Sequence, residues 1–219
     1  MRKQNIYEVW SSEYLMKHKH KNIIDIVDVY EDSSFIVIVM GYVRHGEIDK
    51  NEDIFRNKEQ KNEFINQILD AVSFLHSNGI THRDIKMNNI LLSSRSPLQI
   101  QLIDFGLSIT ISLSQTISEC CGTIIYSAPE ITLSKPYNNK VDIWSIGVIS
   151  YMLKYGELPV KISEGMIDKK DLAVKYDEIS RKVEEIEKGK DLLLVVIKGS
   201  IVRSMYHRLS IEEIKENVH

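Results

Sequence analysis

The segment His82-Arg83-Asp84-Ile85-Lys86-Met87-Asn88-Asn89 carries the strongest signal in this chain. It has the pattern H-R-D-x-K-x-x-N. Two short motifs follow it, Asp104-Phe105-Gly106 and Ala128-Pro129-Glu130. A single Asp is usually a helix cap or a turn residue, and a D-F-G triplet also occurs by chance. No single motif is therefore decisive, and the informative feature is that all three occur together in this order.

Two further patterns lie downstream of that segment and complete the set. Residues 122–130 read G-T-x-x-Y-x-A-P-E, and residues 142–147 read D-x-W-S-x-G. The chain resembles the eukaryotic protein kinase family, of the serine/threonine type. The resemblance implies a protein-kinase-like α+β fold, mainly the α-helical C-lobe with a truncated β N-lobe. Residues 1–42 would be the N-lobe remnant (helix C, two strands and the start of the hinge), and residues 43–219 the C-lobe.

Composition excludes several other classes of protein. The 219 residues carry a net charge of −3, so the chain lacks the overall positive charge that favours binding to nucleic acid or an acidic membrane. No apolar run is long enough to span a bilayer. The two cysteines, Cys120 and Cys121, are adjacent and unsuited to a structural disulfide. We therefore expect an intracellular protein, cytoplasmic or nuclear, without a nucleic-acid or membrane partner.

Hydrophobic periodicity and turn residues predict the elements. A capped, amphipathic helix is expected at 58–77, with Asn57 as its N-cap, Gln60 reaching back to it, and Gly79 ending it. A helix that is apolar nearly all round is expected at 141–155 and should be buried. The other expected elements are helices at 6–19, 168–190, 191–197 and 210–217, strands at 23–30, 35–40, 80–81, 90–92 and 100–103, and a loop at 108–119.

The resemblance assigns chemical roles to four residues. Phosphoryl transfer from ATP needs positioning, metal ions on the phosphates and an acceptor for the hydroxyl proton. Asp84 is the expected proton acceptor, and Lys86 would neutralise the transferring phosphoryl group. Asn89 and Asp104 are the expected ligands of Mg²⁺, a cation that prefers oxygen donors. ATP and Mg²⁺ are thus the expected cofactors.

Four other residues match positions that hold the nucleotide in the family. Met40 falls at the gatekeeper position. Gly41 and Val43 fall where backbone groups hold the adenine ring. Glu47, in Arg44-His45-Gly46-Glu47-Ile48, falls where an acidic side chain meets a ribose hydroxyl.

The acceptor class follows from Lys86, which in the family accompanies serine/threonine kinases. Thr123 resembles the threonine that bonds the catalytic Asp and Lys, and Tyr126 the substrate-site tyrosine after it. The expected substrate is a protein with a Ser or Thr hydroxyl. Several local matches, such as Lys135-Pro136-Tyr137-Asn138, favour the calmodulin-dependent and checkpoint-kinase group.

Two structural roles follow from the same resemblance. Glu130 should form a buried ion pair with Arg208. Asp142 should hold the backbone of the catalytic loop.

Arg83 precedes the catalytic Asp, and kinases with this arginine often need a negative charge on the activation loop. Glu119 occupies the usual phosphothreonine position and would partly replace a phosphate, although an ordinary surface glutamate is an equal alternative. Thr116 and Ser118 stay open as phosphorylation sites.

The start of the chain departs from the family pattern. It contains neither a G-x-G-x-x-G loop nor a V-A-I-K lysine. The helix-C glutamate position holds Ser11, with Glu8 and Glu13 nearby.

Three interpretations stay open: an active kinase whose N-terminus lies upstream, a minimal kinase that works poorly, or a pseudokinase that acts as a binding module. The apolar strand from Phe35 to Met40 needs a cover, either further strands or a regulatory protein.

Overall fold

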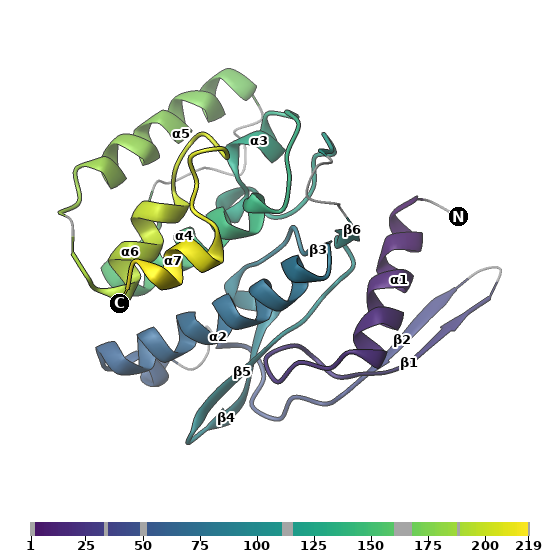
Figure 1. Cartoon of the computed structure of the whole chain (residues 1–219). Helices are drawn as coiled ribbons and strands as arrows, with labels where there is room; N and C mark the ends of the chain where they lie inside the picture. Colours follow the sequence, from purple (N-terminus) through teal and green to yellow (C-terminus); the bar gives the residue numbers. More distant parts are fainter. Residues whose placement is uncertain are drawn as a thin grey trace. The chain divides into compact units, whose positions relative to one another are not determined.

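A computed structural model describes residues 3–32, 35–48, 52–110, 116–159, 168–187 and 189–218 (Figure 1). The chain forms two compact units. Unit 1 contains Met1–His82 and Met87–Ser112, and unit 2 contains Arg83–Lys86 and Leu113–His219. The division into lobes at residues 42 and 43 stays a prediction.

Unit 1 begins with a helix packed on a β-hairpin. Helix α1 spans Lys3–Lys17 and lies against strand β1, Ile26–Glu31 (Figure 1). Strand β1 pairs antiparallel with β2, Ile36–Met40. The expected helix and hairpin are thus confirmed, although β1 starts later than predicted. Ile23 forms a bridge with Leu102 instead, in which Ile24 N–H donates to the Leu102 carbonyl oxygen and the Asn22 carbonyl oxygen accepts from the Leu102 N–H. Ser33 and Ser34 of the predicted turn lie outside the described residues.

Helix α2, Lys58–Ser77, follows a short 3-10 helix at Glu52–Phe55 and confirms the prediction for this segment. Its buried stripe contains Phe64, Ile68, Leu69, Val72 and Leu75. The Asn57 side chain accepts a hydrogen bond from the Gln60 backbone N–H. The expected return bond from the Gln60 side chain is wrong, because its oxygen is buried without a partner in the described part of the chain.

Two small antiparallel strand pairs follow α2 in unit 1. Strand β4, Ile90–Arg95, pairs with β5, Leu98–Leu102. Strand β3, Ile80–Thr81, pairs with β6, Ile109–Thr110. Strand β6 corrects the first part of the loop predicted at 108–119, of which residues 111–115 lie outside the described residues. Two residues are too few to produce a strand period, and their structure depends on the partner strand far away in the sequence.

Unit 2 is helical around a buried central helix. Helix α4, Lys140–Tyr155, is buried from Val141 to Tyr151, as its sequence predicts, and Gly156 caps it with a left-handed φ of 71°. Helix α6, Leu192–Ser200, packs on it. The other helices of the unit are α3 (Pro129–Thr132), α5 (Lys169–Glu184) and α7 (Ile211–Glu216). None of the helices in the described ranges is long and apolar enough to cross a membrane.

Sequence caps explain where the later helices begin. The Asp191 side chain accepts from the backbone N–H of Leu193 at the start of α6. Ser210 and Glu213 form a reciprocal capping box at the start of α7. Each bond satisfies a backbone N–H that the first helical turn leaves unpaired. The predicted boundaries at 191 and 210 correspond to these caps.

Candidate active site

The predicted proton acceptor is held by three hydrogen bonds within unit 2. Asp84 is almost fully buried. Its Oδ1 accepts from the backbone N–H of Thr123 at 3.0 Å and from the Thr123 hydroxyl at 2.9 Å. Its Oδ2 accepts from Lys86 Nζ at 2.7 Å. Charge-assisted bonds of this kind fix a carboxylate in one orientation, which a positioned proton acceptor requires.

Lys86 and Thr123 form the other side of the same cluster. Lys86 Nζ lies 3.0 Å from the Thr123 hydroxyl, which accepts from it while donating to Asp84. The structure thus brings together the two predicted catalytic residues and the predicted threonine. The Lys86 side chain stays partly exposed, with 21% of it accessible to solvent. It can therefore meet an incoming anionic group while bonded to Asp84.

Close backbone packing makes this arrangement possible. Gly122 has a φ of 84°, and a Cβ atom at this position would lie 2.6 Å from the carbonyl oxygen of Arg83. Any side chain would therefore push apart the two backbone segments that carry Asp84 and Thr123. The glycine in Cys121-Gly122-Thr123 is a steric requirement of the site.

The catalytic loop is anchored to the central helix. Arg83 has a φ of 70°, an uncommon conformation for a residue with a side chain. Its backbone N–H donates to Asp142 Oδ1 at 2.8 Å, and Asp142 is completely buried in the first turn of α4. The predicted contact between Asp142 and this loop is confirmed. It stabilises the strained backbone immediately before Asp84.

The Arg83 side chain binds the activation segment. Its Nη1 lies 2.8 Å from Glu119 Oε2 and 3.0 Å from the hydroxyl of Tyr137. That hydroxyl in turn donates to the carbonyl oxygen of Glu119 at 2.8 Å. The guanidinium is buried, whereas 56% of the Glu119 side chain is exposed. The predicted pair between Arg83 and Glu119 is therefore formed.

Tyr137 and Cys121 complete this cluster and were missing from the sequence-based site. Burial raises the pKa of the Tyr137 hydroxyl well above its usual value, so it stays protonated and can donate. Burial also raises the pKa of the Cys121 thiol beside Arg83. The only sequence signal was the position of Tyr137 in the Lys-Pro-Tyr-Asn segment, which does not reveal a hydrogen bond to Arg83.

The predicted metal ligands lie in unit 1. Asp104 follows β5, has a φ of 64° and is exposed. Asn89 is buried, and its carbonyl oxygen accepts from the backbone N–H of Ile103 at 2.9 Å. This bond places Asn89 beside the residue that precedes Asp104. The His82 ring lies 3.0 Å from the carbonyl oxygen of Ile103 and packs on Phe105, which holds the same segment.

The surroundings of Asp104 fit a hard divalent cation. A Cβ atom at Gly106 would lie 3.2 Å from Asp104 Oδ1 and 3.5 Å from Glu8 Oε1, so both carboxylates border one backbone position. Burial and the charge of Asp104 raise the pKa of Glu8. A bound Mg²⁺ would neutralise part of this negative charge, and its preferred donors are oxygens such as those of Asp104 and Asn89.

Helix α1 contacts the segment after Asp104 through a serine, where the family pattern has a glutamate. Ser11, at the helix-glutamate position, is completely buried, and its hydroxyl accepts from the Ser108 hydroxyl at 2.9 Å. Glu13 is exposed. Glu8, one turn before Ser11, is the carboxylate of α1 that lies beside Asp104. The structure thus distinguishes the two glutamates that the sequence offered as imperfect substitutes for the helix-C glutamate.

The predicted nucleotide residues lie at the end of β2, which closes with Met40, and in the segment that follows it in unit 1. Met40 is 46% exposed, and Val43 is buried. The Gly41 N–H donates to the Asp25 carbonyl oxygen at 2.8 Å, so its own carbonyl is the group that could meet an adenine ring. Glu47 Oε2 accepts from the Asn88 side chain at 3.2 Å. Their roles toward a nucleotide stay predictions.

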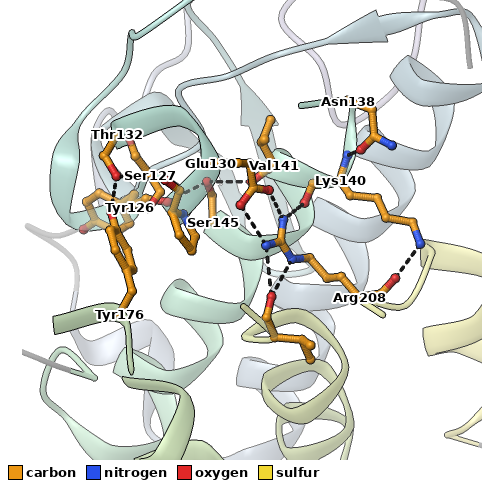
Figure 2. Close-up of polar contacts among 12 residues, drawn as sticks. Tyr126, Ser127, Glu130, Thr132, Asn138, Lys140, Val141, Ser145, Tyr176 and Arg208 are labelled. Atoms are coloured by element: carbon orange, nitrogen blue, oxygen red, sulfur yellow. Dashed lines mark hydrogen bonds and ion pairs between the residues drawn. The ribbon is translucent and has the colours of Figure 1, made fainter. Parts of the chain in front are cut away.

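The end of the activation segment is fixed by a buried ion pair. Arg208 donates to both oxygens of Glu130, at 2.6 Å and 3.2 Å, as Figure 2 shows. It also donates to the carbonyl oxygens of Val202 and Lys140. The predicted pair is confirmed, and its remaining donors are satisfied, as a buried guanidinium requires.

Tyrosine and serine hydroxyls fix the segment before Glu130 (Figure 2). Ser145 of α4 donates to the Tyr126 carbonyl oxygen at 2.8 Å. The hydroxyl of Tyr176, from α5, donates to the Ser127 carbonyl oxygen and accepts from Thr132. Neither Ser145 nor Tyr176 was assigned a role from sequence, because such contacts depend on helix packing.

Comparison with known proteins agrees with this geometry. The family described as "Protein kinase domain" matches residues 3–219. Calcium/calmodulin-dependent protein kinase type 1 of Caenorhabditis elegans is 40% identical over 149 residues, which cover 66% of this chain and 42% of the relative. The Caenorhabditis briggsae protein of the same name is also 40% identical, over 66% of this chain and 41% of its own length.

A third relative comes from a mammal. NUAK family SNF1-like kinase 2 of Rattus norvegicus is 39% identical over 150 residues, covering 67% of this chain and 24% of the relative. The chain thus spans less than half the length of each of these three curated relatives. The family match covers nearly all of the sequence, and the predicted ion pairs and catalytic-loop contacts are present. The chain therefore belongs to the protein kinase family and is similar within it to the calcium/calmodulin-dependent kinases.

Proposed function

We propose that this chain transfers the γ-phosphate of ATP to Ser or Thr hydroxyls of a protein substrate. The observation that carries the proposal is the cluster of Asp84, Lys86 and Thr123. A proton acceptor and a cation are held in one hydrogen-bonded unit, as phosphoryl transfer requires. Family membership supports the kinase class, and the Ser/Thr acceptor rests on Lys86 and Thr123.

Each residue of the cluster has a separate task. Asp84 orients the substrate hydroxyl and receives its proton, because its carboxylate is fixed by Thr123 and Lys86. Lys86 offsets the negative charge on the phosphoryl group being transferred. Thr123 holds both side chains by one hydroxyl, which donates to the carboxylate and accepts from the ammonium group.

Magnesium and the nucleotide are assigned to unit 1. Asp104 and Asn89 would hold Mg²⁺, which when bound neutralises the phosphate oxygens. Met40, Gly41 and Val43 would line the adenine site, and Glu47 would accept from the ribose. Glu47 lies within hydrogen-bond distance of Asn88, so ribose binding would compete with or extend that bond. An intracellular location, cytoplasmic or nuclear, stays a prediction.

A catalytically inactive binding module is the second candidate. The observation in its favour is the exposed apolar surface of the β1–β2 hairpin, where Phe35 is 70%, Tyr30 57% and Val37 51% exposed. Apolar side chains that share one strand surface mark sites covered by another protein or segment. A regulatory protein bound there is compatible with either function. The intact Asp84 cluster favours the kinase.

Transfer of labelled γ-phosphate to matched peptides tests the proposal. The acceptors are three peptides that differ only in carrying Ser, Thr or Tyr, with Mg²⁺ present. Transfer to the Ser and Thr peptides should disappear in Asp104→Asn and persist in Asp171→Asn, an exposed residue at the start of α5. Transfer to the Tyr peptide alone would overturn the acceptor class. No transfer above the Asp104→Asn level would favour the binding module.

A further inference from the structure

A cavity of about 510 Å³ lies in unit 2, beside the end of the activation segment. Its lining includes Pro129, Leu133 and Pro136 from the end of the activation segment, and Met205 and Tyr206, which precede α7. Its volume falls in the range of sites that enclose a ligand or a large side chain, roughly 300–1,000 Å³. The catalytic cluster described above uses none of these residues.

The charges around the cavity are predominantly positive. Glu130 lines it, but both of its carboxylate oxygens are bonded to the buried Arg208. Lys135 is exposed, and within the described ranges its ammonium group has no ion-pair partner. Arg203 forms an ion pair with Asp177 that is open to solvent on both sides, and such pairs are weak. The whole chain, by contrast, carries a net charge of −3.

The rim of the cavity carries an exposed aromatic residue. Tyr206 is 78% exposed, although Met205 beside it is buried. A tyrosine in this position can cover an apolar group that enters the cavity, at a low cost in side-chain freedom. Aromatic residues next to a pocket are common energetic centres of protein interfaces.

We propose that this cavity docks an extended segment of the protein substrate. A large apolar side chain of that segment enters between Leu133 and Met205, and acidic residues beside it meet Lys135 and Arg203. The inference deepens the proposed function and rests on it.

Pro129 is six residues after Thr123, so the cavity lies within about 20 Å of the catalytic cluster along the chain. Docking there would hold an acceptor hydroxyl near Asp84.

Fluorescence anisotropy with a defined peptide tests the docking step without requiring catalysis. The probe is a fluorescein-labelled peptide, Gly-Glu-Leu-Phe-Glu-Gly, and the comparison peptides replace Phe with Ala or both Glu with Lys. The full chain should bind the probe more tightly than either comparison peptide. Tyr206→Ala and Lys135→Glu should each weaken binding about tenfold.

Two exposed positions elsewhere in unit 2 provide matched controls. Val174→Ala truncates an exposed apolar side chain, and Lys190→Glu reverses an exposed positive charge, both away from the cavity lining. They should leave binding unchanged. The proposal is overturned if the probe binds no better than the Lys peptide, or if the cavity variants and the control variants bind it equally.

Steady-state kinetics connects docking to the substrate. A Ser acceptor peptide extended by the docking sequence should have a lower KM than the acceptor alone. Tyr206→Ala should raise that KM about tenfold, leave kcat unchanged, and not affect the unextended peptide. Equal KM values for the two peptides would overturn the substrate role. Probe binding without any phosphate transfer would instead count against the proposed function, so the two failures are distinguishable.

Discussion

Single residues in this protein are fixed by more than one partner, which is why a short motif can specify so much geometry. Asp84 illustrates the point, because Thr123 and Lys86 together occupy both of its oxygens. Arg83 contacts Asp142 through its backbone, and Glu119 and Tyr137 through its side chain. A change at either residue therefore has effects that its own chemistry alone would not suggest.

The ion pair between Arg83 and Glu119 gives the first prediction. Glu119→Ala removes the carboxylate that the buried guanidinium binds, so the activation segment should become less ordered. Phosphate transfer to a Ser peptide should fall, with Glu119→Gln intermediate because an amide oxygen can still accept. Equal activity of Glu119→Ala and the parent chain would show that Glu119 is an ordinary surface residue.

The pair of Glu130 and Arg208 gives a prediction on stability. Removing one buried partner leaves the other charge unpaired, so Arg208→Leu should lower the free energy of unfolding by about 3–5 kcal/mol. Urea titration followed by circular dichroism measures this difference. The double variant Glu130→Leu with Arg208→Leu should be more stable than Arg208→Leu alone. A double variant less stable than Arg208→Leu would show that the unpaired charge of Glu130 does not cause the loss of stability.

At the scale of elements, packing between helices determines details that no local pattern contains. Helices α4 and α6 approach closely because Gly147 has no side chain. A Cβ atom there would lie 2.7 Å from the Ser200 Cβ and 2.8 Å from Ile201 Cγ1. Both neighbours are buried, so neither can move away freely.

Gly147→Ala should therefore be destabilising, although alanine is the better helix former. Overpacking of a buried contact costs about 1–3 kcal/mol, more than the gain of up to about 1 kcal/mol in helix propensity. Chemical denaturation measures the change. Gly189→Ala, outside the helices, serves as a control and should have the smaller effect. A Gly147→Ala variant as stable as the parent would mean that the two helices can separate slightly.

The contact between α5 and the activation segment gives a pH prediction. Burial raises the pKa of Tyr176 to about 12, from about 10 in the unfolded chain. As the pH rises, the unfolded state loses this proton first. The contribution of Tyr176 to the free energy of unfolding is therefore fully present below about pH 10 and is lost as the pH rises toward 12. Tyr176→Phe should reduce the slope of stability against pH in that window. Urea titrations between about pH 9.5 and 11.5, a window that begins near the reference pKa of tyrosine, measure this slope. The same slope in Tyr176→Phe and in the parent chain would contradict the assignment.

At the scale of the whole molecule, the sequence predicts the class of fold and most of the site. The helices at 58–77 and 141–155 follow from periodicity and caps, whereas the contacts of Thr123 with Asp84 and Lys86 follow from the resemblance to the kinase family. Strand β6 and the role of Tyr137 could not be predicted, since both depend on contacts between segments distant in the sequence. The choice between Glu8 and Glu13 also required the structure, because both lie near the expected position on α1.

Nucleotide binding and phosphate transfer, measured together in two variants, test the central claim most directly. Asp84→Asn should bind Mg²⁺ and ATP like the parent chain but transfer no phosphate to a Ser peptide, because the proton acceptor is lost. Asp104→Asn should lose both transfer and the Mg²⁺-dependent part of ATP binding. The account predicts this separation. Phosphate transfer by Asp84→Asn at the parent rate would contradict it.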